Sequence, residues 1–324
     1  MNSENMSSSG LLLVTGATGF VGRALCTEAA MRGHHVRGAV RMPISIAASF
    51  DSIAVGSISP DTDWRAALQG IDVVIHLAAR VHVMQDRSAD PLAAFRYTNV
   101  DATLHLARQA AAAGVERFIF ISSVKVNGEE SIPGRPFAAD DLPAPRDPYG
   151  ISKMEAEQGL LAIAAATGMA VVIIRPPLVY GPGVKANFSS MMRWLSRGVP
   201  LPLGAIDNRR SLVALDNLVD LILVCCHHPA AVNQIFMVSD GEDLSTTDLL
   251  RRMGEALSRP ARLIPVPAKW LLAGATLLGK SSVASRLCGS LQVDIAKTRQ
   301  LLEWTPPVTV DEALRRAALG KSPT

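Results

Sequence analysis

Tyr149 and Lys153 are the residues best suited to chemistry, and they stand four positions apart in the run 147–153 (DPYGISK). A helix is expected to begin in this run, so both side chains would lie on one face, one turn apart. An ammonium beside a phenol lowers the pKa of the tyrosine from its usual value of about 10. Such a tyrosine can exchange a proton with an alcohol oxygen while hydride moves at the carbon. The same spacing occurs on ordinary solvated helices, so the surrounding elements must decide.

A glycine-rich turn near the N-terminus predicts a nucleotide site. The apolar run 11–15 indicates a buried strand, and a helix is expected to follow to about Arg32. Between them, Gly16 would make the tight turn and Gly19 would let a pyrophosphate approach the helix N-terminus. Gly22 would allow close packing of the helix on the strand. Because strand, turn and helix come in this order, the sequence predicts a dinucleotide fingerprint rather than a plain corner.

The second strand, residues 35–40, bears on the choice of cofactor. An NAD-binding unit usually ends this strand with Asp or Glu, which binds the ribose 2′-hydroxyl. Here Val40 holds that place and Arg41 follows it. No carboxylate would repel a 2′-phosphate, and a guanidinium is available to bind one. The sequence therefore favours NADP(H) over NAD(H), unless Arg41 is a plain surface cation.

Further strands and helices alternate along the first half of the chain. Residues 72–79 and 118–121 form apolar runs typical of buried parallel strands, and residues 91–113 predict one long Ala-rich helix. This alternation predicts an α/β fold with a doubly wound, parallel, Rossmann-type sheet. Ligands of such sheets bind at the carboxyl ends of the strands. Ser123 follows one of these ends, so its hydroxyl can join Tyr149 and Lys153, or it can simply cap the strand.

Taken together, the chain resembles the extended short-chain dehydrogenase/reductase family along nearly its whole length. Six segments carry the resemblance in the family's order: 15–22 (TGATGFVG), 76–79 (HLAA), 97–100 (YTNV), 121–128 (ISSVKVNG), 149–153 (YGISK) and 175–183 (RPPLVYGPG). Within the family, the chain looks most similar to bacterial nucleotide-sugar epimerases and 4-ketosugar reductases.

The resemblance implies roles for individual residues. Ser123 would hydrogen-bond the substrate oxygen, Tyr149 would be the acid/base, and Lys153 would lower the pKa of that tyrosine and hold the nicotinamide ribose. The implied cofactor contacts are Gly16, Thr18, Gly19, Phe20, Val21, Gly22, Arg41, Leu77, Ala78, Ala79, Tyr149, Lys153 and Pro176.

The resemblance also implies contacts to a UDP-sugar substrate. Asn187 and Arg210 would hold the diphosphate, for which a guanidinium fork is suited, although Arg210 could equally be a solvated cation beside Arg209. Lys125 stands where relatives often carry Thr or Ala, close enough to Ser123 to touch substrate. Leu178 stands where many relatives carry Asn, which puts one substrate contact in doubt.

The sequence leaves three hypotheses for the function, two enzymatic activities and one binding role. The first is NADPH-dependent reduction of the C4 ketone of a nucleotide sugar, such as UDP-4-keto-6-deoxy-N-acetylglucosamine, for a surface polysaccharide such as lipopolysaccharide O-antigen. The alternative is a UDP-sugar 4-epimerase with tightly bound NAD. A nucleotide-binding scaffold without catalysis is the third, but it would be expected to have lost Tyr149 or Lys153.

Composition sets the remaining expectations. The polar segment 1–10 reads as a disordered tail, 11–175 as the cofactor domain, and 176–324 as a smaller substrate-binding lobe interleaved with it. A net charge of +3 without a basic stripe argues against nucleic acid. Four cysteines without ligand spacing, and no signal-like segment, predict a cytoplasmic protein that binds no metal. The family resemblance implies a homodimer.

One apolar stretch is left over, residues 270–279 (WLLAGATLLG). It is much shorter than the ~20 residues that span a bilayer, so no transmembrane span is expected. A buried or dimer-facing helix is the favoured interpretation, and contact with a membrane surface is the alternative.

Overall fold

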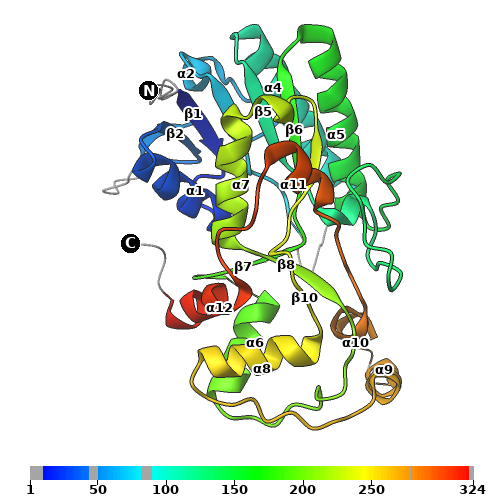
Figure 1. Ribbon diagram of the computed structural model, residues 1–324. Helices are drawn as coiled ribbons and strands as arrows, with labels where there is room; N and C mark the ends of the chain where they lie inside the picture. The colour runs from blue at the N-terminus through cyan, green and yellow to red at the C-terminus, as the bar shows by residue number, and fades with distance from the viewer. Residues whose placement is uncertain are drawn as a thin grey trace. The chain divides into compact units, whose positions relative to one another are not determined.

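The computed structural model describes residues 10–43, 50–81, 90–184, 186–277, 279 and 281–320 (Figure 1). The predicted tail therefore lies outside the described residues, apart from Gly10. By its internal contacts the chain forms two compact units. The first unit comprises residues 1–126, 145–174 and 222–235, and the second comprises 127–144, 175–221 and 236–324. Each unit takes segments from several parts of the chain.

A seven-stranded sheet with the order β3-β2-β1-β4-β5-β6-β9 organises the fold. Its first six strands pair in parallel with their neighbours. The strands are β1 (Leu11–Thr15), β2 (His35–Val40), β3 (Asp51–Ala54), β4 (Val73–His76), β5 (Arg117–Ile121), β6 (Ala170–Arg175) and β9 (Ile235–Met237). The apolar runs of β1, β4, β5 and β6 are buried because helices cover a parallel sheet on both faces, whereas the edge strand β3 is largely exposed. The predicted doubly wound, Rossmann-type α/β sheet is confirmed.

Helices of the first unit pack on this sheet around one apolar core. Large buried members of that core are Trp64, Leu106, Phe118, Phe120 and Leu160. The helices are α1 (Phe20–Met31), α2 (Arg65–Leu68), α3 (Pro91–Arg96), α4 (Ala102–Ala112) and α5 (Pro148–Thr167), with a short 3-10 turn η2 (Val124–Val126). The end of α5 is set by Gly168 at φ 79°, a left-handed cap that glycine adopts without steric cost.

The predicted single helix over residues 91–113 is interrupted. A π-helical turn, η1 (Tyr97–Asp101), separates α3 from α4. The sequence does not reveal such a turn, because both flanking segments have helical periodicity and residues 97–101 (YTNVD) contain no Pro or Gly to mark a break. π-helical turns often lie at functional sites, and this one carries the buried Asn99.

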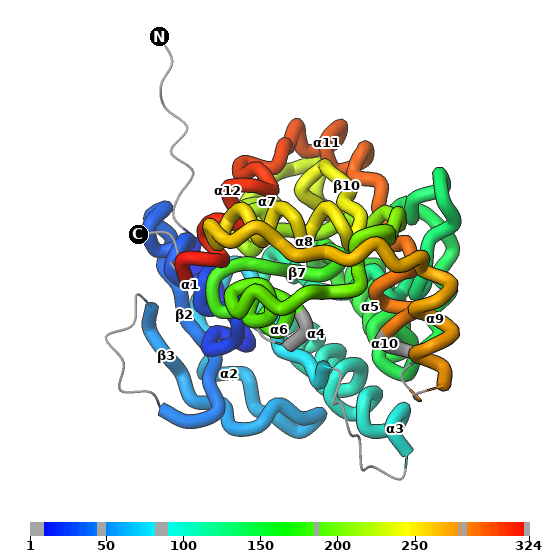
Figure 2. Tube along the Cα trace, turned by 90° about the horizontal axis from the view of Figure 1, so that it is seen from below, coloured from blue at the N-terminus to red at the C-terminus, as the bar shows by residue number. Residues whose placement is uncertain are grey.

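The second unit has its own small sheet and core. Its strands β7 (Leu178–Tyr180), β8 (Arg210–Ala214) and β10 (Asp243–Leu244) pair in the order β10-β8-β7. The core gathers Tyr180, Phe188 and Leu250 with other apolar side chains. Around it lie α6 (Ala186–Ser196), α8 (Thr246–Ala256), α9 (Ala268–Leu277), α10 (Ser281–Cys288) and α12 (Val310–Leu319) (Figures 1 and 2). The helix α11 (Ala296–Leu302) also falls within the residue ranges of the second unit and contributes no described residue to this core.

The helix α7 (Leu215–His227) runs through the boundary at residue 221 and so contributes residues to both units, while the 3-10 turn η3 (Pro229–Ala231) belongs to the first. None of the described helices combines the length and the apolar character needed to cross a membrane.

Candidate active site

The predicted catalytic residues meet where β5 ends and α5 begins. Ser123 follows β5 and Tyr149 lies in the first turn of α5, and the Ser123 hydroxyl is hydrogen-bonded to the phenol. The Ser122 backbone N–H donates to the Ile174 carbonyl at 2.8 Å, which fixes the chain just beyond the strand end. The structure therefore brings together two side chains that are 26 positions apart in the sequence.

Lys153 is anchored at the same strand end. Its Nζ donates to the Ile121 carbonyl at 2.7 Å and lies 4.2 Å from the centre of the Phe120 ring. The side chain is buried, and this desolvation lowers the pKa of Lys153 to about 7, against the opposing effect of the Glu157 carboxylate. The ammonium thus stands one turn from Tyr149 and at the base of the Ser123 segment.

The pKa of Tyr149 differs from the sequence-based expectation. Burial raises it to about 12, the Asp147 carboxylate raises it further, and only the hydrogen bond from Ser123 lowers it. The net shift is therefore upward, and because Lys153 is not among its causes, the role implied for Lys153 stays a prediction. The sequence shows the spacing of two side chains on a helix, but it does not show how much solvent the fold removes from each.

The start of α5 is held by an ion pair that the sequence did not predict. The Asp147 carboxylate caps the helix by accepting from the Gly150 N–H at 2.6 Å, and it also binds the Lys125 ammonium. The Lys125 backbone N–H donates to Ser123 Oγ at 3.2 Å. Lys125, predicted to touch substrate, therefore joins η2 to the helix that carries Tyr149.

Asn99 ties α5 to the segment after β4. Its amide oxygen accepts from the Arg80 N–H at 2.8 Å, and its amide nitrogen donates to the Arg80 carbonyl and to Ser152 Oγ, both at 3.0 Å. Ser152 in turn donates to the Tyr149 carbonyl at 2.8 Å. The structural role implied for this asparagine in the 97–100 motif is thus visible as a set of hydrogen bonds that reaches the Tyr149 backbone.

The glycine turn between β1 and α1 has the geometry of an anion site. Gly16 has φ 70°, and a Cβ on Gly22 would fall 2.1 Å from the Gly16 carbonyl oxygen, so neither position tolerates a side chain. No side chain caps the N-terminus of α1, whose first residues are Phe20 and Val21, and both Thr18 and Gly19 are exposed. The helix N–H groups and dipole are therefore free of a capping side chain, which suits a dinucleotide pyrophosphate.

A buried histidine network fixes this turn, and sequence reasoning missed it. His76 Nδ1 is 2.8 Å from Thr15 Oγ1 and its Nε2 is 3.0 Å from Thr103 Oγ1. Thr15 Oγ1 also accepts from the Ala78 N–H at 3.2 Å. Desolvation lowers the pKa of His76 to about 3, so the ring is neutral. Leu77, Ala78 and Ala79, predicted to line the cofactor, follow this residue and are partly exposed.

The basic residues at β2 have separate environments. Arg41 is exposed directly after the strand, as a residue that contacts a 2′-phosphate would need to be. Arg37, by contrast, donates to the carbonyls of Ala67 and Gln69 at 3.0 and 2.8 Å. Its guanidinium holds the end of α2, so Arg41 is the better candidate of the two for binding phosphate.

The remaining predicted site residues belong to the second unit. The side chain of Asn187 lies outside the described residues, and Pro176 is buried just after β6. Arg210 Nη1 donates to the carbonyls of Arg286 and Gly289 at 2.8 and 2.9 Å. These bonds orient its side chain within the second unit, and burial lowers its pKa against the effect of Glu130. Its diphosphate contact stays a prediction.

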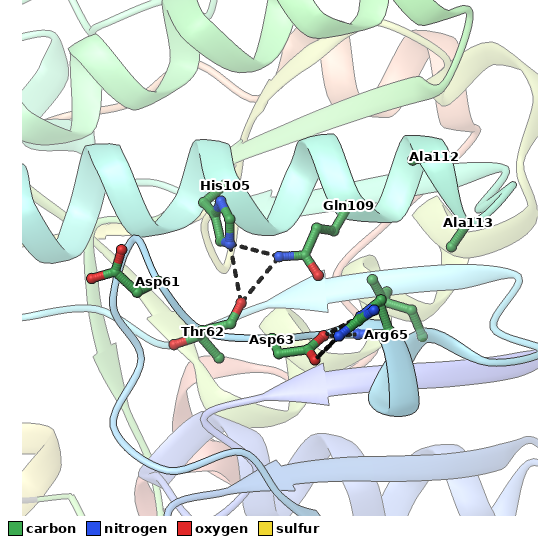
Figure 3. Close-up of a pocket in the computed structure, with 9 residues that line it drawn as sticks. Asp61, Thr62, Asp63, Arg65, His105, Gln109, Ala112 and Ala113 are labelled. Atoms are coloured by element: carbon green, nitrogen blue, oxygen red, sulfur yellow. Dashed lines mark hydrogen bonds and ion pairs between the residues drawn. The ribbon is translucent and has the colours of Figure 1, made fainter.

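A separate hollow lies between α4 and the segment 61–68 (Figure 3). His105 and Gln109 both contact the Thr62 carbonyl there, at 3.1 and 3.0 Å, while Asp63 pairs with Arg65. None of the predicted site residues lines it, and its polar groups bind one another. Within the described part of the chain no three His, Cys, Asp or Glu side chains are grouped as metal ligands.

Comparison with known proteins agrees with this geometry. The model of the NAD dependent epimerase/dehydratase family matches residues 12–239. UDP-glucose 4-epimerase from Vibrio cholerae is 48% identical over 311 residues, covering 95% of this chain and 94% of that one. A 3 beta-hydroxysteroid dehydrogenase/Delta 5-->4-isomerase from Mycobacterium tuberculosis is 30% identical over 328 residues, covering 94% and 88%. The solved structure of MoeE5 with UDP-glucuronic acid and NAD has a TM-score of 0.76 at 26% identity, covering 96% and 98%.

A chain with this sheet, this glycine turn and this Ser–Tyr–Lys site is an enzyme of the extended short-chain dehydrogenase/reductase type, as its sequence indicated. It belongs to the NAD dependent epimerase/dehydratase family.

Proposed function

We propose that the chain is a UDP-sugar 4-epimerase that works with bound NAD. The observation that carries the proposal is the assembled trio of Ser123, Tyr149 and Lys153 in a chain that is 48% identical, over almost its full length, to a UDP-glucose 4-epimerase. UDP-glucose and UDP-galactose are therefore the first substrates to test. The 3 beta-hydroxysteroid dehydrogenase/Delta 5-->4-isomerase, at 30% identity, is the less similar relative.

In this reaction Tyr149 must take a proton from the sugar C4 hydroxyl and later return it. When bound, NAD would accept the hydride from C4 and give it back on the other face. The phenol carries its proton at neutral pH because its pKa is near 12. Tyr149 can act as base only once that pKa falls, and the hydrogen bond donated by Ser123 and the positive charge of Lys153 both favour the phenolate.

The residues of the glycine turn and of β4 would hold NAD. The pyrophosphate would lie on the N-terminus of α1, against Thr18, Gly19, Phe20 and Val21, and Leu77 to Ala79 would line its adenosine side. Lys153 would bind the nicotinamide ribose, and its tie to the Ile121 carbonyl orients it.

The first sequence-based hypothesis, an NADPH-dependent 4-ketoreductase, has less support. The most informative relatives are a UDP-glucose 4-epimerase and a solved structure that contains NAD. The preference for NADP rests on Val40 and the exposed Arg41 alone. Net reduction needs an exchangeable cofactor, whereas epimerisation returns the hydride and suits a cofactor that stays bound.

The experiment that tests the proposal is interconversion of UDP-glucose and UDP-galactose by the purified chain, followed by anion-exchange chromatography without added cofactor. Epimerisation, with about one NAD per chain released on denaturation, is the expected result. Consumption of NADPH with a UDP-4-keto sugar and no epimerisation would overturn it in favour of the reductase. Tyr149→Phe tests the site, and Tyr97→Phe is the matched control because Tyr97 is exposed.

The broader setting is proposed on the same basis. We infer a cytoplasmic homodimer that supplies a sugar nucleotide for surface polysaccharide, with residues 11–175 as the cofactor domain and 176–324 as the substrate-binding lobe. Size-exclusion chromatography with light scattering tests the dimer. The sugar nucleotide that forms in the interconversion identifies the polysaccharide precursor.

A further inference from the structure

The helix α9 carries an exposed apolar face. None of its residues is buried, and Trp270 and Leu277 expose 66% and 89% of their surface. Ala273, also exposed, lies between them at positions i+3 and i+7 of the same helix, so the three side chains form one stripe. The opposite face of the helix is half-buried, with Leu271 packed on the core of the second unit, so the favoured interpretation of a buried or dimer-facing helix stays a prediction. An exposed stripe that contains Trp and Leu indicates a surface that a binding partner covers.

The stretch of sequence that contains α9 carries charge of one sign. Residues 256–293 contain no Asp or Glu and carry five basic residues, whereas the whole chain has a net charge of only +3, so the remaining residues sum to −2. Arg259, Arg262 and Lys269, which precede the stripe, are exposed. The segment that carries them runs along the edge of the second unit into α9 (Figure 1). An apolar stripe thus continues from a cationic segment.

This combination favours an anionic partner over a second copy of the chain. A twofold dimer through α9 would place the same cationic segment against itself, and like charges repel. A bilayer with anionic lipids offers opposite charge to the arginines and an apolar interior to Leu277. Tryptophan is enriched at the boundary between headgroups and acyl chains, where its ring and its N–H are both accommodated.

The dimensions define the mode of binding. Ten residues of α-helix measure about 15 Å, half of the ~30 Å hydrocarbon core, so α9 can lie on a bilayer but cannot cross it. We propose that the α9 stripe (Trp270, Ala273, Leu277) and the cations Arg259, Arg262 and Lys269 form a docking surface for anionic phospholipid membranes. This surface does not depend on the proposed epimerase activity, and its test does not use that activity.

Flotation of the purified full chain with vesicles tests the docking surface. Vesicles of phosphatidylcholine with about a third phosphatidylglycerol are compared with pure phosphatidylcholine at low salt, where attraction to the surface is strongest. Leu277→Glu removes the apolar tip. Leu142→Glu is the matched control, because Leu142 is also 89% exposed and the change of charge is the same.

Binding to the anionic vesicles, weakened about tenfold or more by Leu277→Glu and unchanged by Leu142→Glu, is expected from the lost apolar contact and the added negative charge. Lys269→Glu should weaken binding by about fivefold or more, since each cation near an anionic surface contributes roughly that factor. Trp270 fluorescence should shift to shorter wavelength on binding.

Three results would overturn the docking surface. These are absence of binding to the anionic vesicles, equal binding by Leu277→Glu, and a dimer of the parent chain that Leu277→Glu converts to monomer. The last result would show that a second copy covers the stripe. Thermal unfolding of each variant establishes that it folds, and none of the changed side chains is buried.

Discussion

Two tyrosines, one in each unit, show how similar residues acquire different chemistry. Tyr149 in the first unit is half-buried, is hydrogen-bonded by Ser123, and meets the Phe95 ring edge-on at 6.0 Å. Tyr180 in the second unit is fully buried, stacks on Phe188 at 5.3 Å and donates to Asp240 Oδ2 at 2.8 Å. Both phenols therefore pack on a phenylalanine ring and both have a polar partner.

The polar partner makes the difference. A serine hydroxyl can donate to a phenolate, and its hydrogen bond lowers the pKa of Tyr149. Burial, and after it the Asp240 carboxylate, which can only accept, raise the pKa of Tyr180 well beyond the range in which a phenol exchanges protons. Burial is the first cause in both cases, and of the two phenols only Tyr149 has a partner that lowers its pKa.

The strongest test of this comparison is Tyr149→Phe. Turnover of UDP-glucose should fall by about 10²–10⁴, the usual loss when a general acid/base is removed. Thermal stability should change little, because only the contact to Ser123 is lost. Rates and melting temperature measured on the same preparation check both statements, and a variant with full turnover would contradict the role of Tyr149.

Tyr180→Phe should give the reverse pattern. Asp240 would lose the donor to Oδ2 while keeping those to Oδ1 from the Ala214 N–H and Asn217 Nδ2, both at 2.7 Å. Loss of a hydrogen bond to a charged, buried group costs about 1.5–3 kcal/mol. Urea denaturation should show this loss of unfolding free energy. Turnover should stay within about twofold, because Tyr180 is not expected to contribute to the activation free energy, of which about 1.4 kcal/mol corresponds to a tenfold change in rate. A large loss of turnover in a folded variant would place Tyr180 in the reaction.

The sequence revealed the parts of the site that are local. The glycine turn and the Tyr149–Lys153 spacing lie within short segments whose residue types and order carry the information. The His76 network and the ion pair of Lys125 with Asp147 join residues 61, 27 and 22 positions apart, and no periodicity connects them. The expectation of a lowered pKa for Tyr149 fails for the same reason, since desolvation depends on all the side chains that pack around the ring.

A second asymmetry between the units concerns acid. All seven histidines fall within the residue ranges of the first unit. His76 has its pKa lowered to about 3 in the fold, so its contribution to stability is complete above its unfolded pKa near 6.5 and is lost as pH falls toward 3. From pH 7.5 to 5.5 it should reduce the free energy of unfolding by about 1.4 kcal/mol.

Urea denaturation at the two pH values measures this loss. His76→Gln, which cannot be protonated, should show a smaller decrease between pH 7.5 and 5.5 than the parent chain. An equal decrease in both would mean that His76 is not the group responsible.

The smallest expected effect concerns the helix that presents Tyr149. Asp147→Ala removes the cap on the Gly150 N–H and should cost about 1 kcal/mol of stability. Asp147→Asn keeps a capping oxygen and loses only the charge, so it should retain most of that stability. Melting temperatures of the two variants separate the contribution of the helix cap from that of the Asp147 charge. Equal losses of stability would show that the ion pair with Lys125 is the larger contribution.

The π-helical turn at Tyr97–Asp101 changes the angular position of the side chains of α4 relative to those of α3. Upstream of it, Phe95 faces Tyr149 and the Arg80 guanidinium. Downstream, Thr103 faces His76, and Leu106 enters the core. The additional residue of the π-helical turn lets α3 and α4 each direct their own side chains toward these contacts. A deletion of one residue here would rotate one half by about 100° and put the two sets of contacts out of step.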